Sequence, residues 1–303
     1  MPASKEDRAE VRRLIPIVCA RQEKVGVARR SLQRIYRKVT KSSGTFATNT
    51  QLDVLHVSVS PLDLETGVQD EKFRTFFKPL SKPELPTINW KKLKLWEPRA
   101  DSKPLEEAHR IRYNLGEVEV AFLWAFSDRD ESSPWVSGKH DTRYSLPTVG
   151  FLNEHPYEWA GHSELQAKDL WQTHYLFHLE NCIEPQESLS RAELLAISAY
   201  MKERAALPEH LEHYYFPILC VSSFAGKARI LQAYHDGKNL CISKSDLYDF
   251  RENQIENYEL FARWMYSKPC GDINEALDVE APELDSHCRR DTIRLVKKAY
   301  GMI

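Results

Sequence analysis

The residue types best suited to chemistry gather in residues 127–150, which show neither helical nor strand periodicity. This stretch contains Trp135, His140, Asp141 and Tyr144. A histidine titrates near neutral pH, an adjacent carboxylate can orient it, and a tryptophan supplies an apolar wall. Segments of this length without regular structure are usually either functional or disordered. We therefore predict that the stretch borders the ligand site, if there is one, with Trp135, His140 and Asp141 on its inner side; plain disorder is the alternative.

A pair of histidines, His174 and His178, forms a second candidate within residues 164–182, which we expect to be a helix. The helix prediction rests on a capping box that Ser163 and Gln166 would form at its start. Histidines one turn apart have a spacing that zinc sites use. However, no glutamate follows the first histidine as it does in the H-E-x-x-H motif. We therefore interpret both as hydrogen-bonded core residues and predict no metal site.

The triplet His235-Asp236-Gly237 could either take part in chemistry or only reverse the chain direction. Asp-Gly between two strand-like runs is a strong signal for a hairpin with a two-residue loop. In that register Leu231 lies opposite Ile242, so that one face of the hairpin is apolar. Turn geometry therefore explains the triplet. His235 stays a minor candidate for a functional residue, because sites often form at the end of a sheet.

Two carboxylates, Glu117 and Glu119, begin the run 117–126, which we expect to be a central strand. Residues two apart on a strand project from the same face, so the pair could serve a metal or an acid-base site. A solvated strand end explains the two glutamates equally well, and we do not include them among the site residues.

Positive charge is concentrated near the N-terminus, where residues 8–41 hold eleven Lys or Arg and two Glu. Ala28, Leu32, Ile35 and Val39 recur at three- and four-residue steps, which predicts an amphipathic helix. The basic candidates for binding are Arg29, Arg30, Arg34 and Arg37. The helix could dock on the protein's own acidic surface, contact a phosphate backbone or another anionic partner, or lie on a membrane surface. We favour docking on the protein itself.

The charges of the whole chain nearly balance, with 42 basic and 44 acidic side chains and a formal net charge of −2. No global field therefore draws the protein towards nucleic acid or anionic lipid. The segment from Trp90 to Trp96 combines tryptophans with lysines and could stack bases, but tryptophans that anchor a long loop are the commoner case. We do not expect nucleic acid or a membrane as a partner. A small molecule and a protein are both still candidate partners.

The six cysteines show no C-x-x-C pair and no disulfide or zinc-ribbon spacing, so we interpret them as reduced thiols. The N-terminal residues lack a long apolar run and include acidic side chains, which argues against a signal or transit peptide. No segment approaches the roughly 18 apolar residues of a membrane span. These features predict a soluble intracellular protein, either cytoplasmic or nuclear.

Motifs of nucleotide-dependent enzymes are missing from the sequence. There is no G-x-G-x-x-G, no G-x-x-x-x-G-K-[ST] and no G-x-S-x-G, and the eleven glycines in 303 residues leave little room for glycine-rich phosphate loops. We therefore predict that the protein uses no cofactor.

Local signals favour an α+β fold in which several helices pack an antiparallel sheet. Residues 214–243 have the pattern of a three-stranded meander that includes the Asp-Gly hairpin. A capping box of Ser190 and Glu193 begins a helix over 191–206. A further helix over 252–266 can cover the apolar face of the meander.

From Tyr215 to Asp272 the strand, the hairpin and the motifs LYDF, ELFARWM and PCGD resemble an uncharacterised family of proteins from filamentous fungi. The resemblance covers about a fifth of the chain, and its motifs are structural. It implies a fungal, intracellular setting and transfers no site residue to this chain.

Two hypotheses of different classes follow for the function. The first is a binding or regulatory protein of unknown ligand, which we favour because catalytic motifs are absent. The alternative is a cofactor-independent enzyme, in fungal metabolism, whose site is assembled from dispersed His, Asp and Glu. In either case we expect a basic helical segment, residues 1–48, followed by a single α+β domain, residues 49–303. Whether the protein is an enzyme stays open at this point.

Overall fold

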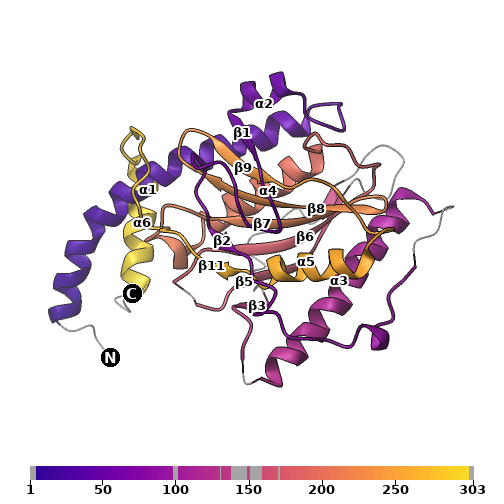
Figure 1. Cartoon of the computed structure of the whole chain (residues 1–303). Coiled ribbons are helices and arrows are strands. Elements are labelled where there is room, and N and C mark those ends of the chain that lie inside the picture. Colours follow the sequence, from indigo (N-terminus) through magenta and orange to yellow (C-terminus); the bar gives the residue numbers. More distant parts are fainter. Residues whose placement is uncertain are drawn as a thin grey trace.

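The computed structural model describes residues 5–97, 102–129, 131–137, 149–150, 159–169 and 171–299. Within these ranges the helices are α1 (Lys5–Thr40), α2 (Asn49–Leu55), α3 (Pro104–Ser127), α4 (Arg191–Arg204), α5 (Gln254–Met265) and α6 (Ser286–Ala299). The strands are β1 (Val57–Pro61), β2 (Phe77–Lys78), β3 (Trp135–Ser137), β4 (Val149–Gly150), β5 (Trp159–Ala167), β6 (Tyr175–Asn181), β7 (Ile218–Ser223), β8 (Lys227–His235), β9 (Leu240–Lys244), β10 (Tyr248–Asp249) and β11 (Lys268–Pro269). Figure 1 shows one large sheet with helices packed around it.

The large sheet is mixed, with the order β1-β9-β8-β7-β6-β5-β3. Most neighbours are antiparallel, but β1 runs parallel to β9 and β6 runs parallel to β7. A parallel neighbour requires a connection that crosses one face of the sheet, and α4 lies on the connection between β6 and β7. The expected combination of helices with a largely antiparallel sheet is thus confirmed, with parallel pairs in addition.

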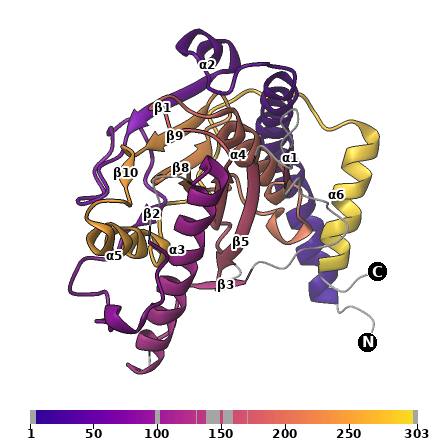
Figure 2. The same ribbon diagram turned by 90° about the vertical axis from the view of Figure 1, so that its right-hand side faces the viewer.

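Helices cover both faces of the sheet, as Figure 2 shows. On one face, α1 and α4 bury apolar side chains such as Leu32 and Ile197 against β6 to β9. On the other face, α3 and α5 bury side chains such as Phe122 and Phe261. The sheet strands are therefore buried on both sides, which explains why the strand β7 consists of buried residues throughout.

The amphipathic N-terminal helix predicted from the sequence is confirmed as α1. Leu32, Ile35 and Val39 are buried in the core shared with α4 and the sheet, and the N-terminal half of α1 packs on α6 through Val11 and Val18. The division of the chain at residue 48 stays a prediction. In the described residues, no helix combines the length and the apolar content that crossing a bilayer requires.

The run 117–126 is not a strand, as the sequence pattern suggested, but the C-terminal part of α3. Its buried residues Val118, Phe122 and Phe126 recur every four positions, which is the helical period. The run is apolar enough to fit both the strand period of two and the helical period of about 3.6. The helix is favoured because it begins upstream at Pro104 with acidic residues in its first turn. On a helix, Glu117 and Glu119 do not lie side by side.

The helix expected over 164–182 is also wrong, because this segment forms β5, a turn and β6. Ser163 caps no helix: it lies in β5 with a φ of 48°, where the pairing with β6 shifts between His162 and Leu165. Such a bulge bends the strand and redirects the neighbouring side chains. The apolar residues of this segment fit a helical stripe and a strand alternation equally well, and pairing with β7 selects the strand.

The helix predicted over 191–206 is confirmed as α4, together with its capping box of Ser190 and Glu193. Downstream, β7, β8 and β9 pair in sequence as antiparallel neighbours. The predicted register of this hairpin is wrong, since His235 pairs with Leu240 and not with Lys238. The backbone N–H of Asp236 donates to the carbonyl of Asn239 at 3.1 Å, so the two turn residues are Gly237 and Lys238. Asp236 favours this position of the turn because its Oδ1 accepts hydrogen bonds from the backbone N–H groups of residues 238 and 239, at 2.7 and 2.6 Å.

The helix predicted over 252–266 is present as α5, but it covers the opposite face of the meander. The register of β8 and β9 is displaced by two residues, so every side chain keeps its face. Leu231 and Ile242 lie in the core formed with α1 and α4. Instead, α5 packs in the cluster that contains Ile230 and Tyr234. The apolar face was therefore already occupied by the N-terminal helix.

Candidate acid-base site on the sheet

The residues predicted to border a ligand site are only partly described. Trp135 is buried on β3, where its indole N–H donates to the carbonyl of Ser267 at 3.0 Å and its ring stacks on Phe77. It therefore anchors the edge of the sheet in the core. His140, Asp141 and Tyr144 lie outside the described residues, so a ligand site along this stretch stays a prediction.

The four arginines predicted as binding candidates all lie on the exposed side of α1. These residues are Arg29, Arg30, Arg34 and Arg37. Among the described residues none of the four has a carboxylate within ion-pair distance. The apolar side of α1 docks on the protein as expected, but its basic side does not.

Two of the histidines considered from the sequence are ordinary parts of the core. His174 lies within 2.9 Å of the carbonyl of Cys270 through its Nε2, and burial lowers its pKa to about 4. The Nδ1 of His235 accepts from the backbone N–H of Gly237 at 2.9 Å, and burial lowers its pKa to about 4 as well. Both rings are therefore neutral at physiological pH. In the parts of the chain that the structure describes, no three His, Cys, Asp or Glu residues are arranged to hold a metal ion.

A different group of polar side chains converges on Glu180, which lies on β6 under α3. Its carboxylate is fully buried and contacts three basic side chains from two other elements. His109 Nδ1 lies 3.0 Å from Oε1, His162 Nε2 lies 3.0 Å from Oε2, and Arg112 Nε lies 3.3 Å from Oε2. We name these residues, together with His178, the Glu180 cluster.

Local structure explains why these side chains meet. His178 and Glu180 are two residues apart on β6 and share the face that α3 covers. His109 and Arg112 are three residues apart on α3, so both project from the side of that helix that faces the sheet. His162 pairs directly with His178 across β5 and β6 and immediately precedes the bulge at Ser163. Bulges often lie beside active sites, where they redirect a side chain.

The surroundings of Glu180 keep its carboxylate ionised. Burial by itself raises the pKa of Glu180, but the contacts with His162 and His109 and the charge of Arg112 outweigh burial, so the pKa lies below its usual range. The cluster thus holds a permanent negative charge beneath two histidines. The side chains of His109 and His162 are 42% and 35% exposed, which places both rings between the buried carboxylate and solvent.

The hydrogen bond to Glu180 also determines the tautomer of His109. Its Nδ1 lies 3.0 Å from the carboxylate and 3.4 Å from Nη2 of Arg112. A single ring nitrogen cannot donate to the first and accept from the second in the neutral form, and the shorter contact is the one to the charged acceptor. His109 therefore carries its proton on Nδ1, and Nε2 is the ring atom that can accept another proton.

His178 lies two residues from Glu180 and is fully buried. Neither of its ring nitrogens has a hydrogen-bond partner among the described residues. Burial, followed by electrostatic interactions with Arg112 and His162, lowers its pKa to about 3, so the ring is neutral. Buried polar groups without partners are rare in folded proteins, and each one calls for an explanation such as a catalytic role or a bound water or ion. The Glu180 cluster is therefore incompletely satisfied inside the protein.

Reasoning from the sequence missed this site, although two signals pointed to it. Read as a strand, residues 174–180 place His174, His178 and Glu180 on one face by simple alternation. Read as a helix, residues 109–112 place a histidine and an arginine on one side. The first signal was hidden because residues 164–182 were interpreted as a helix, and the second because no helix was predicted over residues 109–112.

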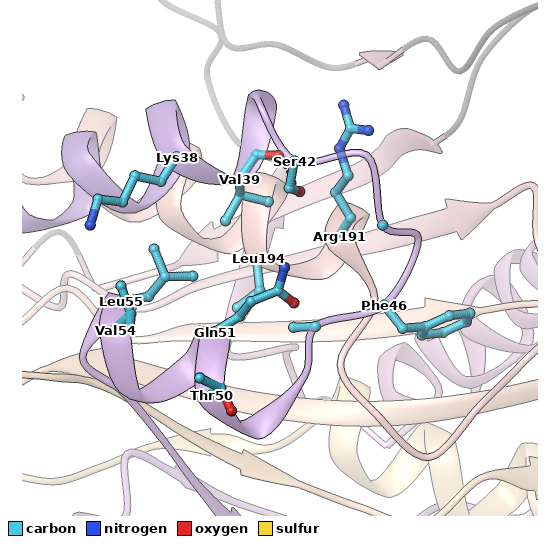
Figure 3. A pocket seen from close by; sticks show the side chains of 12 residues that line it. Lys38, Val39, Ser42, Phe46, Thr50, Gln51, Val54, Leu55, Arg191 and Leu194 are labelled. Carbon is cyan, nitrogen blue, oxygen red and sulfur yellow. Dashed lines mark hydrogen bonds between the residues drawn. The ribbon is translucent and has the colours of Figure 1, made fainter.

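A separate apolar cavity lies on the other face of the sheet, between the C-terminal end of α1, α2 and the start of α4 (Figure 3). It has a volume of about 210 Å³. Its apolar lining includes Val39, Phe46, Val54, Leu55 and Leu194. Lys38 and Arg191 stand at its edge, and they are the only charged side chains among the described residues that line it.

Comparison of the chain with protein-family models, with curated proteins and with solved structures finds no match. The resemblance of residues 215–272 to a family of filamentous fungi therefore stays a prediction.

Proposed function

We propose that the protein is an enzyme in which His109 acts as a general base and Glu180 orients it. The observation that supports this proposal is the ionised, fully buried carboxylate of Glu180 with its 3.0 Å hydrogen bond to the half-exposed His109. This is the geometry by which proteins turn histidine into a directed proton acceptor. It favours the second of the two hypotheses drawn from the sequence, a site of dispersed acidic and histidine residues.

Hydrolysis is the reaction that requires least beyond this pair of residues. His109 Nε2 takes a proton from water, and the hydroxide equivalent attacks an electrophilic carbon or phosphorus atom of the substrate. The imidazolium ion that forms is stabilised by the carboxylate of Glu180, and it then returns the proton to the leaving group. Arg112 and His162 hold the carboxylate in place as positioning residues, since both contact Glu180 itself.

The test uses the purified chain and a panel of p-nitrophenyl esters, phosphomonoesters and phosphodiesters. We expect Glu180→Gln and His109→Gln to lower kcat/KM by about 10²- to 10⁴-fold, the usual contribution of general base catalysis. His287→Gln is the matched control, because His287 also lies 3.0 Å from a carboxylate, that of Asp291, but both side chains are largely exposed. Equal activity in all three variants, or no turnover by the wild-type chain across the panel, contradicts the proposal.

A second candidate function, binding of a small apolar ligand, is favoured by the cavity beside α2. Its volume of about 210 Å³ exceeds the ~150 Å³ of an apolar cavity that admits benzene. Lys38, a cation at its edge, favours a ligand with a carboxylate. Calorimetric titration with benzoate and hexanoate tests this candidate, and Ala47→Phe, which fills the cavity, should abolish the binding. Identical heats for the two chains exclude the cavity as the binding site.

A further inference from the structure

The charges of this protein are sorted in space although they nearly cancel in number. Helices α1 and α6 together carry 16 Lys or Arg and five Asp or Glu. The rest of the chain carries 26 Lys or Arg and 39 Asp or Glu. Figures 1 and 2 show α6 beside the N-terminal half of α1, whose C-terminal half runs on along the sheet. A net charge of −2 therefore hides a strongly basic pair of helices on an acidic body.

The fold uses the apolar sides of both helices and leaves their basic sides exposed. α1 buries Val25, Leu32 and Ile35 in the core of the sheet. α6 buries Val296 in a cluster with Val11 and other residues of α1. The side chains that remain exposed on the two helices include Arg8, Arg12, Arg29, Arg30, Arg34, Arg37, Lys38, Arg289, Arg290 and Arg294. We name this surface the basic arm.

Four arginines of the basic arm make no contact that would hold the fold together. Within the described ranges, Arg29, Arg30, Arg34 and Arg37 form no ion pair and no side-chain hydrogen bond. Unpaired surface cations of one sign repel one another, so this arrangement costs stability unless an anion binds. The concentration of positive charge therefore points to a partner rather than to the fold.

The composition of the basic arm discriminates between anionic partners. A membrane helix needs a free apolar face, and the apolar faces of α1 and α6 are buried. A protein partner needs apolar or aromatic anchors, but among the described side chains of these helices Ile17 is the one large apolar group left exposed, at 44%. Arginine outnumbers lysine in the arm, and its planar fork matches the oxygens of a phosphate group.

We propose that the basic arm binds the phosphate backbone of a nucleic acid without reading its sequence. The overall charge balance, from which we expected no nucleic acid partner, does not describe the field at this surface. Two adjacent helices with exposed arginines present a row of phosphate contacts, and contacts of this kind give salt-dependent affinity without base specificity. This inference is independent of the acid-base site on the other side of the sheet.

The test is fluorescence anisotropy with the full chain and a labelled duplex of about 20 base pairs, repeated between about 50 and 200 mM salt. We expect a dissociation constant in the range of roughly 10⁻⁴ to 10⁻⁶ M that weakens steeply with salt. The variant with Arg29, Arg30, Arg34 and Arg37 replaced by Gln should lose at least tenfold in affinity. The slope of log K against log salt should become shallower by about 3 to 4, roughly 0.9 for each phosphate contact removed.

The matched control replaces Lys82, Lys91, Lys92 and Lys94 by Gln, which removes the same charge from exposed positions outside the arm. It should retain the wild-type affinity and slope, and it also tests the lysines between Trp90 and Trp96. Replacing the four arginines by Lys should restore the slope, which separates loss of charge from loss of structure. No binding by the wild-type chain at low salt, or an equal loss in the control variant, overturns the proposal. The proposal is also overturned if the chain binds phosphatidylserine vesicles but does not bind the duplex.

Discussion

Two buried glutamates on opposite faces of the sheet have contrasting surroundings. Glu193, on α4, pairs with Arg229, and neither side chain is exposed. All five guanidinium N–H groups of Arg229 are used: two bonds reach the carboxylate, and three reach the carbonyls of residues 186–188 at 2.9 to 3.0 Å. Glu193 also accepts the backbone N–H of Ser190 at 2.8 Å. This ion pair is saturated inside the protein.

Glu180 is equally buried, but its surroundings are not saturated. Two of its partners are half-exposed histidines, and the adjacent His178 has no hydrogen-bond partner among the described residues. A buried charge that serves only the fold is stable when every donor and acceptor is paired. A buried charge that serves chemistry must keep partners that can exchange protons with solvent. The comparison therefore distinguishes a structural carboxylate from a candidate functional one without reference to any related protein.

The largest expected effect is the loss of stability when the saturated ion pair of Arg229 and Glu193 is broken. Arg229→Met should destabilise the protein by about 3–5 kcal/mol, because it leaves Glu193 as a buried charge without its cation. Urea unfolding measures the change. The double variant with Glu193→Met should regain much of the loss, since it removes the uncompensated charge as well. A loss below about 1 kcal/mol in the single variant would show that the ion pair of Arg229 and Glu193 does not stabilise the fold as proposed.

Glu180→Gln should have a smaller effect on stability and a larger one on activity. We expect a loss of about 1–2 kcal/mol, because the amide keeps the shape of the side chain and the histidines can rest in their neutral forms. Under the proposed function, kcat/KM falls by about 10²- to 10⁴-fold in the same protein. A destabilisation as large as that of Arg229→Met, with unchanged turnover, would show that Glu180 stabilises the fold and takes no part in catalysis.

The pH dependence of stability should report the neutral, unpartnered His178. Its pKa is about 3 in the folded protein and about 6.5 in the unfolded chain, so between these values the unfolded state binds the extra proton. Stability is therefore highest above about pH 6.5 and falls as the pH is lowered, by up to about 1.4 kcal/mol per pH unit for this residue. His178→Phe should remove that share of the slope between pH 6.5 and 4.5.

The matched comparison for His178→Phe is Asn181→Leu, one strand position from Glu180 on the other face of β6. Asn181 is fully buried, and its amide donates to Ser222 Oγ and to the carbonyl of Ser223, each at 3.0 Å. Its loss should cost about 1–3 kcal/mol at neutral pH, whereas His178→Phe should cost almost nothing there, since no hydrogen bond is broken. Equal costs at pH 7 would show that His178 is satisfied after all.

The smallest expected effect belongs to the exposed charges. Replacing Arg29, Arg30, Arg34 and Arg37 by Gln should change the free energy of unfolding by less than about 0.5 kcal/mol, because these side chains lie on the surface without ion pairs. A thermal melt of the variant checks this. A loss of several kcal/mol would show that the basic side of α1, like its apolar side, is docked on the protein.

Several elements of the fold were readable from the sequence because their signals are local. The apolar steps of α1, the capping box of Ser190 and Glu193, and the strand-like runs of β7 to β9 each lie within one element. Such signals depend on backbone geometry and on neighbours a few residues away. The position of the turn after His235 was missed because the side chain of Asp236 accepts from the backbone N–H groups of residues 238 and 239, which places the turn at Gly237 and Lys238.

Tertiary structure decided the elements whose apolar runs satisfy two periods at once. Residues 117–126 and 164–182 are apolar enough for a helix or a strand, and the available partner selects one: the sheet face for α3, and β7 for β6. The same reason placed α5 on the unexpected face of the meander, since α1 occupies the other. Sequence patterns specify which side of an element is apolar, but the competition among elements specifies what covers it.

The candidate site is the clearest example of a feature that sequence patterns did not reveal. His109 and Glu180 are 71 residues apart and meet only because α3 packs across β6. The sequence by itself determined which residues could titrate and that the N-terminal helix carries a concentration of positive charge. Only the folded chain determined that one carboxylate lies buried beneath two histidines, because burial and proximity are properties of the packed sheet and helix together.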